Sequence, residues 1–171
     1  MSDSTPASPT PARSPFDPPG VEWTSVSPRL VRARFVVIGL VLLVPLVAGV
    51  VLATLVTPWC WSIVVVVVAV ALWSGWLVPR QVRATRYAER DDDLLVRRGI
   101  MFRSLVVVPY GRLQYVDVEA GPVATRFGIA NVQLHTASPA TDAAIPGLGH
   151  DDAALLRDRL AARGEARLAG L

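Results

Sequence analysis

The sequence of 171 residues contains no lysine, a single cysteine and two histidines. Without lysine it cannot form the glycine-rich phosphate cradle that ends in Lys-Ser or Lys-Thr. The lone Cys60 excludes an intramolecular disulfide and a thiolate metal cluster. His135 and His150 are not in His-Glu-x-x-His spacing, and no serine lies in a Gly-x-Ser-x-Gly elbow. We therefore expect no catalytic residue, no metal and no cofactor.

Charge is missing from two long segments, residues 35–56 and 59–78, which are separated by Thr57 and Pro58. A helix over the first segment would be about 33 Å long, enough to cross a hydrocarbon core of about 30 Å. Both segments are too long for a buried strand. The first exceeds the apolar part of a cleaved signal, and a second span follows at once. The pattern predicts a transmembrane helical hairpin over residues 29–80.

Arginines flank this hairpin on both sides, whereas its connecting turn has no charge. By the positive-inside rule, both termini are expected in the cytoplasm and the protein in the cell membrane. A net charge of +3, with arginines next to an apolar block, favours anionic headgroups over nucleic acid as partner. The arginines expected to set the topology are Arg29, Arg32, Arg34, Arg80, Arg83 and Arg86.

The first 28 residues are rich in proline, serine and threonine, with six prolines among the first 20. Such a composition buries too little apolar surface to offset the entropy lost on ordering. Residues 1–28 are therefore expected to be a disordered tail.

Short β-branched runs separated by turn signals occupy residues 81–163, which predicts a cytoplasmic domain made mainly of strands. An amphipathic stretch over residues 151–163 predicts a closing helix, whose dipole Asp151 and Asp152 would complement. Residues 164–171 would form a tail. The expected strands are 83–89, 94–98, 104–110, 113–119, 131–136 and 143–145, with a helical turn at 123–127 and a tight turn at Pro146 and Gly147.

This order of elements predicts an α+β fold, in which a partly closed β-barrel or sandwich is plugged by the C-terminal helix. Several segments of the predicted domain form a recognisable set: 94–99 (LLVRRG), 108–118 (VPYGRLQYVDV), 121–122 (GP), 126–128 (RFG), 134–137 (LHTA) and 145–148 (IPGL). Together they resemble the bacterial pleckstrin-homology domain of the YdbS-like membrane proteins. The resemblance implies a PH-like fold behind a helical hairpin, and partnership with a larger relative that carries several such domains.

Three interpretations of function follow. The first is a membrane-anchored interaction or scaffold module that contacts a membrane protein, a larger relative or a second copy of itself. The second is a sensor of anionic lipid, in which Arg97, Arg98 and Arg103 around the turn at Gly99 contact a lipid phosphate. The third is a subunit of a membrane enzyme or transporter whose active groups lie elsewhere. We expect the first.

Overall fold

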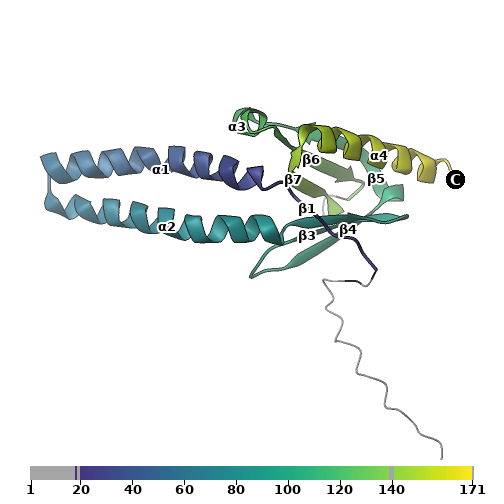
Figure 1. Ribbon diagram of the computed structural model, residues 1–171, viewed down its shortest axis with the longest axis horizontal. Coiled ribbons are helices and arrows are strands. Elements are labelled where there is room, and N and C mark those ends of the chain that lie inside the picture. Colours follow the sequence, from purple (N-terminus) through teal and green to yellow (C-terminus); the bar gives the residue numbers. More distant parts are fainter. Residues whose placement is uncertain (1–17, 19, 139–140, 171) are drawn as a thin grey trace, which may run out of the picture.

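The computed structural model describes residues 18, 20–138 and 141–170. A long hairpin of two helices projects from a β-rich domain (Figure 1). Helix α1 spans Arg29–Leu55 and helix α2 spans Trp61–Ala84. The 3₁₀ turn η1, Pro58–Cys60, joins them at the far end of the hairpin.

The hairpin leaves most of its apolar side chains uncovered. Of the 18 most apolar consecutive residues of the first helix, only 6% are buried. The corresponding share for the second helix is 11%. A core helix of a soluble protein would instead be mostly covered by its neighbours. With 27 residues each, the two candidate spans reach about 40 Å. Both are long and apolar enough to cross a membrane, and the predicted two-helix hairpin is confirmed.

A close approach between the two helices occurs at Gly49. A Cβ atom on this residue would lie 3.0 Å from Ile63 Cγ2, so a larger side chain would push the helices apart. A Cβ atom on Gly39 would meet no atom within 4 Å. Small residues let membrane helices pack closely, and here Gly49 has this role.

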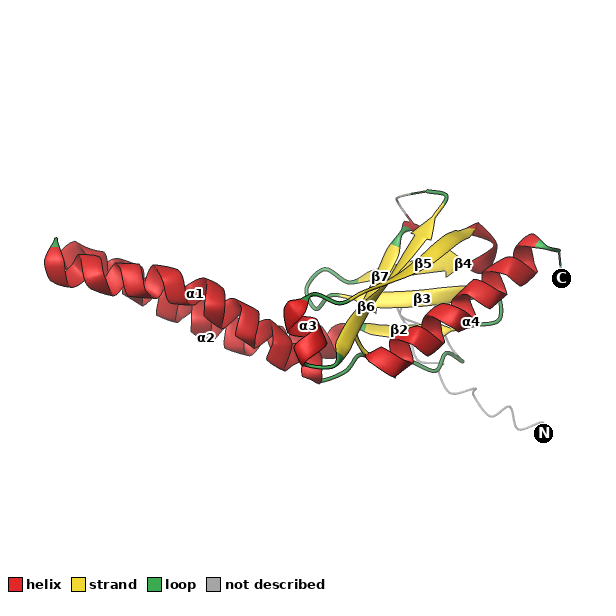
Figure 2. Ribbon diagram, turned by 90° about the horizontal axis from the view of Figure 1, so that it is seen from above, coloured by secondary structure: helices red, strands yellow, loops and turns green. Residues whose placement is uncertain are grey.

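Two antiparallel sheets form the β-rich domain (Figure 2). The first sheet has the strand order β1-β2-β3-β4, and the second has the order β5-β6-β7. The short helix α3 precedes β6, and the long helix α4 ends the chain. The bounds are β1 Thr24–Ser25, β2 Arg86–Glu89, β3 Asp93–Arg98, β4 Ser104–Pro109, β5 Leu113–Glu119, α3 Pro122–Arg126, β6 Ile129–Thr136, β7 Ala143–Gly149 and α4 His150–Leu168.

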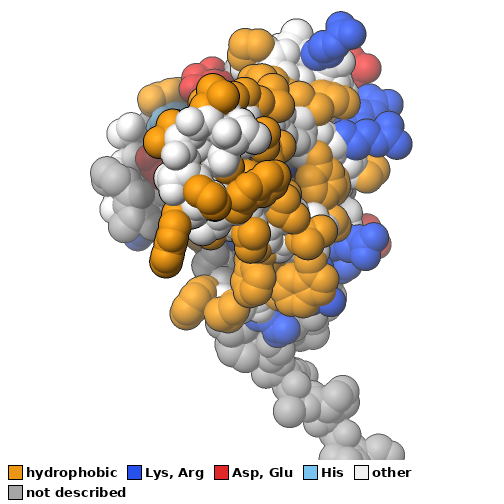
Figure 3. All heavy atoms as spheres, turned by 90° about the vertical axis from the view of Figure 1, so that its left-hand side faces the viewer, with side chains coloured by type: hydrophobic (Ala, Val, Ile, Leu, Met, Phe, Trp, Pro, Cys, Tyr) orange, Lys and Arg blue, Asp and Glu red, His pale blue; other side chains and the backbone are white. Residues whose placement is uncertain are grey.

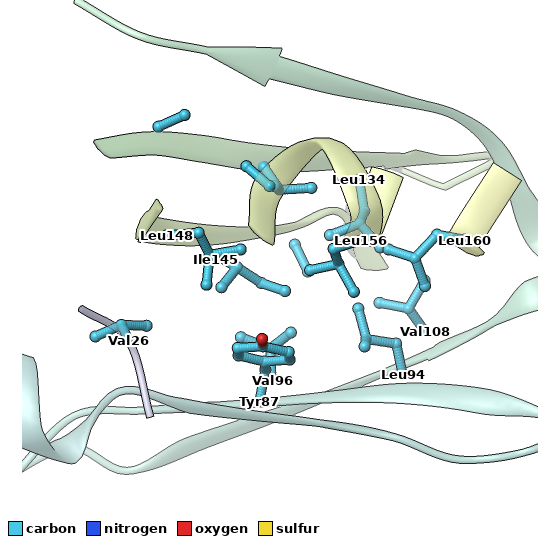
Figure 4. Packing of buried hydrophobic residues seen from close by; sticks show 14 of the residues in the cluster. Val26, Tyr87, Leu94, Val96, Val108, Leu134, Ile145, Leu148, Leu156 and Leu160 are labelled. Carbon is cyan, nitrogen blue, oxygen red and sulfur yellow. The ribbon is translucent and has the colours of Figure 1, made fainter. Parts of the chain in front are cut away.

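Helix α4 closes one open side between the two sheets. Leu156 and Leu160 are fully buried, and in Figure 4 they lie between the sheets together with Leu94 and Val108. The expected plug is therefore present, and of the two expected forms, a partly closed barrel or a sandwich, the structure has the sandwich. Strands β4 and β5 are joined by the 3₁₀ turn η2, Tyr110–Arg112, and the two sheets share no ladder in the described part of the chain. The leucines of α4 lie between the two sheets, and the fold is a sandwich.

A partly buried carboxylate on β2, Glu89, binds two arginines of α4. The Glu89 Oε1 atom lies 3.0 Å from Arg159 Nη2, and its Oε2 atom lies 3.0 Å from Arg163 Nη1. Arg163 Nη1 also donates to the hydroxyl of buried Tyr110 at 3.0 Å. Burial raises the pKa of Tyr110, against the opposing effect of this hydrogen bond. Two arginines one helical turn apart thus share one acceptor on the sheet.

Several expected boundaries need correction. Residues 1–17 and 19 of the expected disordered tail lie outside the described residues. The tail does not extend to residue 28, because β1 pairs with β2 and Val26 is only 5% exposed. The expected C-terminal tail, 164–171, is wrong at residues 164–168, which continue α4.

Two strand limits also differ from expectation. Strand β2 begins at Arg86 rather than at residue 83, because α2 continues to Ala84. Strand β7 extends through the expected turn at Pro146 and Gly147 to Gly149. Gly147 has φ +71° inside this strand and allows the chain to kink without ending the pairing with β6.

The start of α1 packs directly onto this kink. The Ser27 backbone N–H donates to the Gly147 carbonyl oxygen at 2.9 Å, and the Gly147 N–H donates to Asn131 Oδ1 at 3.1 Å. A Cβ atom on Gly147 would lie 2.7 Å from Leu30 Cβ. Leu30, Ala33 and Val82 belong to the same buried cluster as the sandwich residues. The helix ends and the sandwich therefore share one core.

We expect Gly147→Ala to destabilise the protein by about 2–4 kcal/mol, since it adds left-handed strain and overpacking against Leu30. Thermal unfolding of the purified protein in detergent measures this. Gly170→Ala is the matched control, because Gly170 has φ +78° but open space around it, and we expect a cost of only about 1 kcal/mol. Equal losses in both variants would contradict the packing role of Gly147.

Candidate functional site

The end of α2 and the turn between β3 and β4 meet beside the hairpin. The last pair of the β3–β4 ladder joins Arg98 to Ser104, so residues 99–103 form the turn. Gly99 has φ +90°, and a Cβ atom there would lie 1.9 Å from the Phe102 carbonyl oxygen. Only glycine fits this tight reversal. The turn thereby brings arginines from both of its sides close to α2.

Four arginines line one open pocket of about 480 Å³ at this place. Arg80 and Arg83 come from α2, Arg97 lies on β3 just before the turn, and Arg103 is the last residue of the turn. The other described residues that line it are Ala84, Gly99 and Ile100, none of them acidic. Like charges gathered in one pocket raise the local potential and favour a bound anion. Guanidinium groups suit phosphate because they offer paired, charge-assisted hydrogen bonds. We call these four residues the basic pocket.

Two of the four guanidinium groups lie over the ring of a tryptophan. The Arg80 Cζ atom lies 3.7 Å from the centre of the Trp76 ring, one turn earlier on α2. The Arg97 Cζ atom lies 5.2 Å from the centre of the Trp23 ring, just before β1. Both distances are within the range of cation–π attraction. The ordered segment before α1 thus helps to position the pocket.

Arg98, the third arginine predicted to contact a lipid phosphate, is not part of the basic pocket. Its guanidinium donates to the Ala144 carbonyl oxygen, which lies on β7. Burial lowers the pKa of Arg98. The side chain therefore connects the two sheets, and Arg98 lines the neighbouring groove rather than the basic pocket. Neighbouring strand residues point to opposite faces, which separates Arg98 from Arg97.

An apolar groove of about 450 Å³ adjoins the basic pocket and shares Arg80, Gly99 and Ile100 with it. One wall consists of Trp76 and Leu77 on α2. The turn supplies the other wall, with Met101 and Phe102 next to Ile100. The polar residues Arg34, Gln81, Thr85 and Arg98 also line this groove, but most of its lining is apolar.

The remaining arginines predicted to set the topology lie at the same end of the hairpin. Arg34 Nη1 donates to Gln81 Oε1 at 3.3 Å and connects the two helices. Arg29 Nη1 would be 3.6 Å from a Cβ atom on Gly128, so it lies against the turn before β6. Arg86 starts β2, opposite Arg97 in the ladder, and Arg32 is exposed on α1.

Sequence reasoning assigned Arg80 and Arg83 chiefly to topology, with anionic-lipid binding as the alternative, and missed that they share a pocket with Arg97 and Arg103. Their spacing of three residues was the available signal, because residues i and i+3 share one helix face. That signal required α2 to continue beyond residue 80, as it does.

The two histidines lie away from this site. His135 stacks on Tyr115, with ring centres 4.3 Å apart, and its Nδ1 atom lies 3.7 Å from Asp142 Oδ2. His150 Nε2 lies 3.1 Å from the Ile129 carbonyl oxygen. Within the described residues, no three His, Cys, Asp or Glu side chains are grouped around a possible metal position.

Comparisons with known proteins agree with this architecture. The family model of the bacterial PH domain matches residues 33–164, which include most of the hairpin. The chain is also 35% identical over 75 residues to the UPF0699 transmembrane protein YdbS of Bacillus subtilis (strain 168). This match covers 44% of the chain and 46% of the relative, so the chain spans about half the length of that protein. No solved structure matches.

The predicted resemblance to the YdbS-like proteins is confirmed by these matches. The transmembrane relative and the two uncovered apolar helices together make this a membrane protein. The α+β sandwich with its closing helix and the match over residues 33–164 lead to one conclusion: the chain belongs to the bacterial PH domain family.

Proposed function

We propose that this protein is a non-catalytic module, anchored in the membrane by both helices, that binds the headgroup of an anionic phospholipid. The observation that carries the proposal is the basic pocket, where Arg80, Arg83, Arg97 and Arg103 converge at the end of a spanning helix. Charged residues just outside a span lie at headgroup level. The proposal thus puts the pocket at the depth where lipid phosphates are most concentrated.

The orientation follows from the same arginines. Both helices enter the domain at the hairpin end that carries all six juxtamembrane arginines, whereas residues 57–60 at the other end are uncharged. Arginine-rich ends remain in the cytoplasm. The proposal therefore places both termini and the PH-like domain on the cytoplasmic side of the cell membrane.

Reporter fusions test this orientation. A green fluorescent protein fused after Leu171 should fluoresce, and alkaline phosphatase fused at the same point should be inactive. A phosphatase inserted between Thr57 and Pro58 is the matched comparison and should be active. An active C-terminal phosphatase with a dark fluorescent fusion would contradict the proposed topology.

Removing charge from the pocket tests lipid binding. Each arginine near an anionic surface contributes about 1 kcal/mol, so Arg83→Gln with Arg103→Gln should weaken phosphatidylglycerol binding about 30-fold. Both residues are exposed, and the fold should be unaffected. Native mass spectrometry of the full-length protein, titrated with phosphatidylglycerol in detergent, measures the affinity.

The control for this titration removes the same amount of charge elsewhere. Arg112→Gln with Arg157→Gln alters exposed arginines on η2 and α4, outside the basic pocket. Its affinity should equal that of the unmodified protein. Equal weakening by both double variants would mean that only net charge matters, and it would reject the pocket as the binding site.

A second candidate function is a scaffold that binds a membrane protein partner, such as a larger relative or a second copy. The specific observation is a groove of about 270 Å³ between β5, an edge strand of its sheet, and α4. An edge strand offers unpaired backbone groups to which an extended segment of a partner can add. Gln114, Tyr115 and Val116 line the strand side of this groove, and Ala161 and Gly164 line the helix side.

Filling this groove tests the scaffold. Ala161→Trp should remove a stoichiometric partner that co-purifies from host membranes after mild crosslinking. Ala162→Trp adds the same bulk at the next helix position, which does not line the groove, and it should leave the partner bound. Equal recovery with both variants would reject the groove as the docking site.

A further inference from the structure

The turn between β3 and β4 exposes large apolar side chains at its tip. Met101 is 83% exposed and Phe102 is 87% exposed, next to Ile100 at 38%. Single apolar residues are common on protein surfaces, but three consecutive ones on a projecting turn are not explained by the fold. We call residues 100–102 the apolar tip.

The tip lies beside the membrane helices rather than on the far side of the domain. It shares a groove with Trp76, Leu77 and Arg80, which belong to the last turns of α2. In Figure 1 the linked ends of β3 and β4 reach back toward the hairpin and lie beside α2. Seen from the hairpin end, hydrophobic side chains cover much of the near face and arginines lie toward its edge (Figure 3).

Several features keep the tip in this position. The β3–β4 ladder runs without interruption from Asp93 and Pro109 to Arg98 and Ser104. Gly99 permits the tight reversal, and Arg98 ties the end of β3 to the opposite sheet. The helix ends and the sandwich share one core, which includes Leu30 and Val82. The tip therefore cannot swing away from α2 without disrupting buried packing.

We infer that the apolar tip is a third membrane contact, with Met101 and Phe102 inserted into the interfacial layer of the leaflet next to the domain. The flanking Arg97 and Arg103 would then lie at headgroup level, as cationic residues do beside apolar side chains that enter a bilayer. The inference rests on the proposed placement of the domain at the membrane face. It assigns the bilayer itself, not a protein, as the partner of the tip.

Insertion gives the basic pocket a defined geometry. Its walls are α2 on one side and the inserted turn on the other, so a lipid headgroup would enter between two membrane-embedded elements. The glycerol and upper acyl region of the same lipid would contact the groove formed by Trp76, Leu77 and the tip. The domain would then be held at three points, namely the two helices and the turn.

Site-specific fluorescence tests the insertion. Single cysteines are introduced as Met101→Cys or Phe102→Cys in a Cys60→Ser background, and each is labelled with a fluorophore sensitive to polarity. The full-length protein is then reconstituted into phosphatidylcholine liposomes at about one protein per liposome. The control is Val107→Cys, an exposed apolar position about 13 Å beyond Arg103 along β4. Lipids with a nitroxide at acyl carbon 5 serve as quenchers.

We expect a blue shift and strong quenching for labels at 101 and 102, about 5–10 Å below the surface, and neither at 107. Water-like emission without quenching at 101 and 102 would overturn the inference. A blue shift without lipid quenching would also overturn it, because another protein surface would then cover the tip.

These results are independent of lipid selectivity. Liposomes of pure phosphatidylcholine contain no anionic lipid, so quenching there reports insertion alone. Quenching at 101 and 102, combined with unchanged phosphatidylglycerol affinity in the pocket variant, would retain the inserted tip and reject headgroup binding. No quenching at 101 and 102, combined with weaker phosphatidylglycerol binding by the pocket variant, would reject the inserted tip and retain headgroup binding.

Discussion

The contact between Leu30 and the kinked strand at Gly147 determines how the rest of the molecule is arranged. A side chain at Gly147 would overlap Leu30, and the Ser27 N–H is bonded to the carbonyl oxygen of the same glycine. Leu30, Ala33 and Val82 thereby join the buried cluster of the sandwich. Because interiors are close-packed and deform little, this shared core fixes the angle between hairpin and domain.

This rigid connection turns scattered arginines into a site. Arg80 and Arg83 belong to a spanning helix, whereas Arg97 and Arg103 belong to the β3–β4 hairpin of the domain. With a flexible linker between hairpin and domain, the two pairs of arginines would move independently. They would then not form one pocket of fixed geometry. Fixed together, they form one cationic pocket, and the turn that carries two of them is held beside α2.

The hairpin and the α+β class could be predicted because both depend on local patterns: uncharged runs longer than a bilayer is thick, and short β-branched runs between turns. The sequence did not reveal what depends on distant contacts. Strand β1 is two residues long and exists only because β2 lies opposite. The pair Pro146 and Gly147 is typical of a turn but lies inside β7. Arg97 and Arg98 are adjacent residues of the same type, yet the side chain of Arg97 contacts Trp23 and that of Arg98 contacts Ala144.

A distance measurement between hairpin and domain tests the shared core most directly. Spin labels are placed at Ala48→Cys on α1 and Gln114→Cys on β5, both exposed positions, in a Cys60→Ser background and in liposomes. Double electron–electron resonance should give one narrow distance distribution, because a single packed body separates the labels. A broad distribution would mean that the domain moves freely on the hairpin, and it would contradict a basic pocket built from both parts.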